Sequence, residues 1–152
     1  MNKLTDYIKK HPIIDIVLIT VSIIVGSILL GNHSILPTVD IGRELFLPEQ
    51  ILKGAVPYKD ITLIYFPFAY YINAFVYKIL GVSVSSLIIW QTILCIIFMI
   101  MFYLLSRDFL NRKISFVLSL LVIYSCIFNR FSLFSYIFPY SYSTVYGVFG
   151  FF

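Results

Sequence analysis

The sequence consists of long apolar blocks separated by short charged patches. Residues 16–39 and 114–129 contain no Asp, Glu, Lys or Arg, and residues 61–106 contain only Lys78. A helix needs about 20 apolar residues to cross the hydrocarbon core of a bilayer, so these blocks have the length of membrane spans. We therefore expect an all-α protein of polytopic transmembrane helices, with a helical external loop between the first two spans. The predicted spans are residues 13–30, 85–105 and 114–128.

Composition agrees with this pattern. Hydrophobic residues make up 61% of the 152 residues and charged residues only 12%, whereas soluble domains carry about a quarter charged residues. The net charge of +4 does not indicate nucleic-acid binding, because the basic residues lie at the ends of apolar blocks rather than among aromatic residues on one face. Cys95 and Cys126 lie inside apolar blocks without a CxxC spacing, so we interpret both as packing residues rather than metal or redox centres.

Basic residues predict the orientation of the chain. Three lysines precede the first span, which places the N terminus in the cytoplasm, and residues 106–113 contain three more cations. The first apolar run has no small-x-small cleavage site, so we interpret it as a retained helix. Residues 31–60 then form an external loop.

The segment 61–81 is ambiguous, because it is apolar enough to cross but rich in Tyr and Phe and interrupted by Pro67. If both the N terminus and residues 106–113 are cytoplasmic, an even number of crossings separates them. We therefore expect 61–81 to be an interfacial or partly re-entrant helix. Residues 130–147 are expected outside. The apolar residues after Ser143 are too few to cross, so we expect residues 1–152 to be the N-terminal part of one polytopic domain, truncated at 152. We expect this fragment to be inactive on its own.

Candidate acid–base residues are concentrated in the first external loop. Asp40 and Glu44 are four residues apart, so they share one face if a helix starts near Asp40. A carboxylate at the lipid surface is partly desolvated, which raises its pKa and makes it a better general base. The alternative is that Asp40 caps a short helix while Arg43 and Glu44 are solvated.

The stretch from Asp40 to Gly81 carries a wider pattern. After the acid, the pattern has a G-x-x-P-Y-x-D stretch, a Pro-aromatic segment and an Ala-to-Gly ending. These are Gly54, Pro57, Tyr58 and Asp60, then Tyr65, Pro67, Tyr70 and Tyr71, then Ala74 and Gly81. The pattern resembles the first external loop of bacterial GT-C glycosyltransferases, relatives of the protein O-mannosyltransferases and the aminoarabinose transferase of lipid A. Residues 138–142, FPYSY, are similar to a second-loop segment in one bacterial branch.

The resemblance implies a multi-pass enzyme of the bacterial inner membrane that takes a sugar from a polyprenyl-phosphate donor at the external face. Asp40, with Glu44 in reach, would accept the proton of the attacking acceptor. The expected substrate-binding residues are Arg43, Tyr58, Lys59, Asp60 and Tyr65. For Arg43 a solvated or ion-paired role stays open, as does interfacial anchoring for the tyrosines. The resemblance leaves the acceptor undecided between a glycan, a lipid and a protein.

Two departures from the family pattern argue against a metal site in these residues. Many relatives carry adjacent acids in the first loop, whereas three residues separate Asp40 from Glu44 here. Many also carry an acid in the second external loop, but no Asp or Glu follows Asp108. We assign no metal ligand, and a divalent metal requirement stays open.

The rival interpretation is a non-enzymatic polytopic protein, such as a transporter or flippase subunit of envelope-polysaccharide export. A transporter is expected to carry polar groups in mid-helix facing a pathway. The predicted spans hold little beyond Gln91, Ser119 and Ser125, while the acids cluster in a loop, which favours chemistry at the membrane surface.

Overall fold

The computed structural model describes residues 12–30, 39–63, 66–127, 135–137 and 141–150. Within these residues the secondary structure is helical with no strand, so the all-α prediction is confirmed for this part of the chain. The helices are α2 (Ile13–Leu30), α3 (Val39–Leu52), α4 (Phe68–Leu80), α5 (Val84–Phe109), α6 (Arg112–Ile127) and α7 (Tyr142–Gly150).

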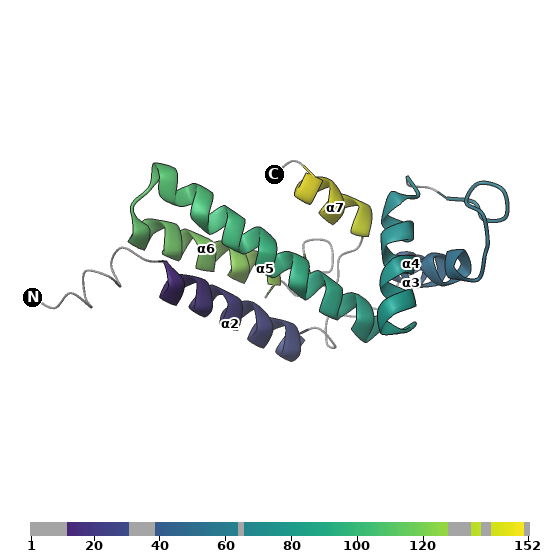
Figure 1. Cartoon of the computed structure of the whole chain (residues 1–152), viewed down its shortest axis with the longest axis horizontal. Coiled ribbons are helices and arrows are strands. Elements are labelled where there is room, and N and C mark those ends of the chain that lie inside the picture. Colours follow the sequence, from purple (N-terminus) through teal and green to yellow (C-terminus); the bar gives the residue numbers. More distant parts are fainter. Residues whose placement is uncertain (1–11, 31–38, 64–65, 128–134, 138–140, 151–152) are drawn as a thin grey trace, which may run out of the picture.

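Helices α2, α5 and α6 lie side by side and form the long body of the molecule (Figure 1). Their shared core is apolar and includes Ile19 and Ile23 of α2, Phe98 and Met99 of α5, and Ile123 of α6. Cys95 is also buried in this core, in agreement with its interpretation as a packing residue.

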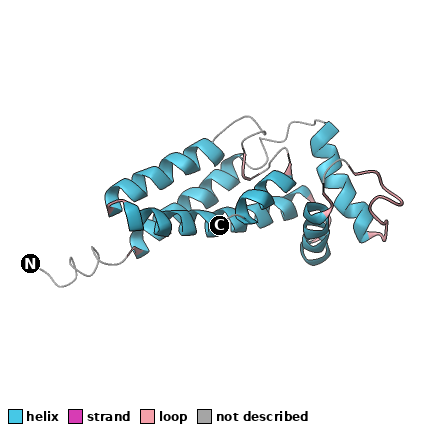
Figure 2. Ribbon diagram, turned by 90° about the horizontal axis from the view of Figure 1, so that it is seen from above, coloured by secondary structure: helices cyan, strands magenta, loops and turns pink. Residues whose placement is uncertain are grey.

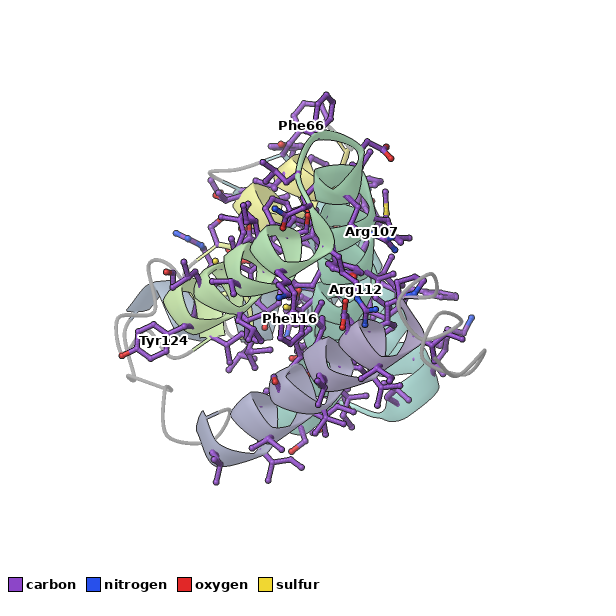
Figure 3. All side chains as sticks on the ribbon, turned by 90° about the vertical axis from the view of Figure 1, so that its left-hand side faces the viewer. Phe66, Arg107, Arg112, Phe116 and Tyr124 are labelled. Carbon is purple, nitrogen blue, oxygen red and sulfur yellow. The ribbon has the colours of Figure 1, made fainter. Side chains whose placement is uncertain are left out.

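An ion pair joins α2 and α6 at one end of this body. The Arg112 guanidinium donates from Nε to Asp15 Oδ2 at 2.6 Å and from Nη2 to Asp15 Oδ1 at 2.8 Å. Figure 3 views the body from this end and labels Arg112. The Tyr103 hydroxyl of α5 donates to the same carboxylate. The start of α2 and the connection between α5 and α6 therefore lie at the same end. This is the arrangement that an even number of crossings between them requires.

One helix in the described part of the chain is long and apolar enough to cross a membrane. It is α5, with 26 residues. Of its most apolar 18-residue stretch, 33% is buried inside the protein. Helices α2 and α6 are shorter, with 18 and 16 residues. The structure thus supplies one candidate span, and the polytopic arrangement stays a prediction.

Helices α3 and α4 pack against each other at the end of the body opposite the Asp15–Arg112 pair (Figures 1 and 2). Among the described residues of the segment 61–81, the helix is α4, which begins directly after Pro67. Figure 1 shows α4 running across the end of α5 rather than alongside it. That orientation suits an interfacial helix, although the membrane position of α4 stays a prediction.

A tight turn produces the change of direction between α4 and α5. Gly81 has φ = +87°, a conformation that side chains disfavour. Ser83 caps α5 by accepting a hydrogen bond from the Ser86 amide, and the Ser86 hydroxyl donates back to the Gly81 carbonyl at 2.7 Å. These contacts fix the α3–α4 pair to the end of the body.

Candidate functional site

Helix α3 carries three of the residues singled out in the sequence. It begins at Val39, so Asp40 is its second residue, as expected for a helix that starts near this acid. Arg43 and Glu44 follow one turn later. The side chain of Asp40 lies outside the described part of the structure, as does Tyr65. The local site is therefore built from Arg43 and Glu44.

Glu44 is an interior acid. Its side chain is 1% exposed, and its Oε1 accepts a hydrogen bond from the Tyr70 hydroxyl of α4 at 3.0 Å. The Arg43 Nη2 lies 3.6 Å from the same oxygen. The alternative in which Glu44 is solvated is therefore wrong. Glu44 instead holds α3 against α4.

Burial determines the pKa values of Glu44 and Tyr70. It raises the pKa of the Glu44 carboxyl above its usual value, and the hydrogen bond from Tyr70, the backbone of Tyr142 and the charge of Arg43 oppose this shift only in part. Burial and the adjacent carboxyl raise the pKa of Tyr70 to about 12. Tyr70 therefore stays protonated and continues to donate, while Glu44 keeps its proton to a higher pH than a surface acid does.

A second buried polar network centres on Tyr146 of α7. Its hydroxyl donates to Asn73 Oδ1 of α4 and accepts from Trp90 Nε1 at 3.1 Å and Gln91 Nε2 at 3.4 Å, both on α5. Asn73 and Gln91 are almost fully buried. One hydroxyl thus connects α4, α5 and α7, and this contact was not predicted from the sequence. A signal was present, because Asn73 and Gln91 interrupt otherwise apolar helices.

The two networks share one face of α4. Tyr70 and Asn73 are three residues apart, so both project from the same side of the helix. We call the combined set the polar seam. It comprises Arg43, Glu44, Tyr70, Asn73, Trp90, Gln91 and Tyr146. The polar seam joins the α3–α4 pair to the body and to α7.

The remaining predicted binding residues belong to a separate exposed turn after α3. Gly54 has φ = +98° and Tyr58 has φ = +66°, and the Tyr58 amide donates to the Ile61 carbonyl at 2.8 Å. The Asp60 carboxylate accepts from the Val56 amide at 2.9 Å, which gives it a structural role in closing the turn. The side chains of Tyr58, Lys59 and Asp60 are exposed. The structure thus groups Arg43 with Glu44 and gathers the other three in this turn.

Within the described residues, no group of three or more His, Cys, Asp or Glu side chains is placed to hold a metal ion. Comparison with known proteins adds no assignment. No family model, no curated protein and no solved structure matches this chain.

Proposed function

We propose that the protein is a membrane glycosyltransferase that transfers a sugar from a polyprenyl-phosphate donor to an acceptor at the external face of the membrane. The observation that carries this proposal is the position of α3. The acid-bearing helix packs with α4 at one end of a body whose helices expose apolar side chains. A base placed there meets a donor whose lipid tail lies in hydrocarbon and whose phosphate lies at headgroup level.

The membrane part of the proposal rests on the exposed surface of the body. Large apolar side chains are exposed on each of its helices, for example Ile28 of α2, Ile89 of α5 and Leu121 of α6. In water a continuous apolar surface of this kind favours association, whereas in a bilayer lipid chains cover it. We assign the Asp15–Arg112 end to the cytoplasmic side and the α3–α4 end to the external side, because the sequence places six lysines and arginines next to the former and four in residues 31–81.

In the proposed reaction Asp40 takes the proton of an acceptor hydroxyl or amine as that group attacks the anomeric carbon. The bond from the anomeric carbon to the phosphate oxygen breaks, its electron pair passes to the phosphate, and the configuration inverts. We assign the leaving phosphate to Arg43, the one basic residue of α3, whose side chain is 17% exposed. Glu44 is enclosed, so we assign it the positioning of Arg43 and α3. Lys59 stays a second candidate for the phosphate.

The transporter alternative receives less support. Gln91 bonds to Tyr146 of the polar seam, while Ser119 donates to the Ser115 carbonyl and Ser125 to the Leu121 carbonyl. These polar groups are used in packing or within their own helix. None of these contacts indicates a polar pathway along the body.

The test is sugar transfer in membranes that contain the protein, with a radiolabelled polyprenyl-phosphate sugar as donor. Asp40→Asn should reduce transfer at least about 100-fold, the effect of losing a general base. The matched control is Glu49→Gln, which removes an acid of the same helix that pairs only with exposed Lys53. Near-normal transfer by Asp40→Asn would overturn the role of Asp40. Absence of transfer by the unaltered full-length protein with every polyprenyl-phosphate sugar supplied would overturn the proposed reaction.

A further inference from the structure

Two adjacent cations at the start of α6, Arg112 and Lys113, have different surroundings. Asn111 caps α6 by accepting the Ile114 amide at 3.0 Å, so Arg112 and Lys113 occupy successive positions of the first turn and project in different directions. Arg112 donates to Asp15 of α2. Lys113 is exposed, and among the described residues it makes no hydrogen bond or ion pair. It is therefore a cation at the surface of this end.

Lys113 stands at one end of a shallow apolar groove on α6. The groove has a volume of about 300 Å³, and its other lining residues are Ile114, Val117, Leu118 and Leu121. Every residue after Lys113 in this lining is aliphatic. Of the three serines of α6, Ser115 and Ser119 are buried, and exposed Ser125 lies one turn beyond the groove and donates to the Leu121 carbonyl. The surface of α6 thus changes from the Lys113 ammonium to aliphatic side chains that cover about two helical turns.

We propose that this groove binds one anionic phospholipid, with an acyl chain along the aliphatic lining and the headgroup phosphate at Lys113. This proposal rests on the membrane placement in the proposed function but not on sugar transfer. A phospholipid carries a phosphate directly next to hydrocarbon chains, which is the same order of charge and apolar surface that the groove presents. A lysine ammonium pairs with phosphate, while its long stem lies along apolar surface.

The charge of this end favours an anionic lipid over a zwitterionic one. Asp15 is already bound by Arg112, so it does not neutralise Lys113. Arg107 lies over the Tyr103 ring, 5.9 Å from its centroid, and adds a second cation next to exposed Asp108. In the sequence, Lys3, Lys9 and Lys10 precede α2, whose start lies at this end. Basic residues next to a span attract lipids with net negative charge.

The experiment measures binding of phosphatidylglycerol and phosphatidylcholine to the purified protein in detergent, by native mass spectrometry. The unaltered protein should bind phosphatidylglycerol more tightly than phosphatidylcholine. Lys113→Gln should weaken phosphatidylglycerol binding about fivefold, the effect expected from removing one basic residue, and should leave phosphatidylcholine binding unchanged. Lys113→Arg should retain the preference. Val117→Asn should weaken both lipids, because it changes the hydrocarbon contact alone.

The matched control is Lys78→Gln, which removes an exposed lysine of α4 at the opposite end of the body and should change neither affinity. Equal binding of the two lipids, or an unchanged affinity of Lys113→Gln for phosphatidylglycerol, would overturn the proposal. Full displacement of the lipid by inorganic phosphate would also overturn it, because it would show that the site recognises free phosphate. Sugar transfer is not measured, so a negative result here leaves the proposed reaction standing.

Discussion

The ion pair between Asp15 and Arg112 yields a quantitative prediction, because these residues are 97 positions apart in the sequence and their contact connects α2 with α6. The pair is bidentate, and the exposed fractions of the two side chains are 10% for Asp15 and 26% for Arg112. Removing one partner of a fully buried pair costs about 3–5 kcal/mol, and a hydrogen bond to a charged group contributes about 1.5–3 kcal/mol. Because Arg112 is a quarter exposed, we expect Arg112→Gln to lower the free energy of unfolding by about 2–3 kcal/mol.

A double-mutant cycle isolates the contact. The variants are Asp15→Asn, Arg112→Gln and their combination, and the assay is reversible unfolding by denaturing detergent in mixed micelles. The double variant should lose less stability than the sum of the single losses, with a coupling of about 1–3 kcal/mol. Lys53→Gln is the control, since its pair with Glu49 is exposed and should contribute under about 0.5 kcal/mol. Single losses that add without coupling would refute the inference that this pair holds α2 to α6.

Three further predictions concern the α3–α4 pair and the polar seam. The Glu44 pKa is raised in the folded state, so Glu44 should stabilise the fold most below its unfolded-state pKa, and this stabilisation should be lost as the pH rises through the folded-state pKa. Glu44→Gln should therefore flatten this part of a plot of melting temperature against pH. An unchanged plot would contradict the raised pKa. Tyr146→Phe should cost about 1–3 kcal/mol in thermal unfolding, because it leaves buried Asn73 without its donor, whereas exposed Tyr71→Phe should be neutral. Gly54→Ala should destabilise by about 1 kcal/mol because φ is +98°, while Gly42→Ala, in helix α3 with open space around it, should not; equal effects would contradict the strain at Gly54.

Local patterns in the sequence predicted where the helices lie better than they predicted which helices contact each other. The first apolar block predicted residues 13–30, which are the bounds of α2. The shared face of Asp40 and Glu44 depended on a helix that starts near Asp40, and α3 begins at Val39. Both features depend on neighbouring residues alone. The segment 61–81 was predicted helical throughout, but Pro67 delays α4 to Phe68, because proline suits only the first turn of a helix.

The contacts between distant residues could not be predicted in the same way. Whether Glu44 is solvated or enclosed depends on Tyr70, which is 26 residues away and belongs to another helix. The bonds from Tyr146 to Asn73 and Gln91 likewise require the packing of three helices. A single sequence shows that these polar residues occur in apolar helices, but not which of them meet. The hydrogen-bond partners of these buried polar residues are therefore visible only in the structure.

We propose that the α2–α5–α6 body spans the membrane and that α3 and α4 form an external cap across one end of it. The most direct test is cysteine labelling in intact cells with a membrane-impermeant maleimide, in a background where Cys95 and Cys126 are replaced by Ala. Lys53→Cys after α3 and Val82→Cys after α4 should both be labelled from outside, and Asp108→Cys only after permeabilisation; all three positions are exposed in the fold. Labelling of Val82→Cys only after permeabilisation would show that α4 crosses the membrane and would contradict the account.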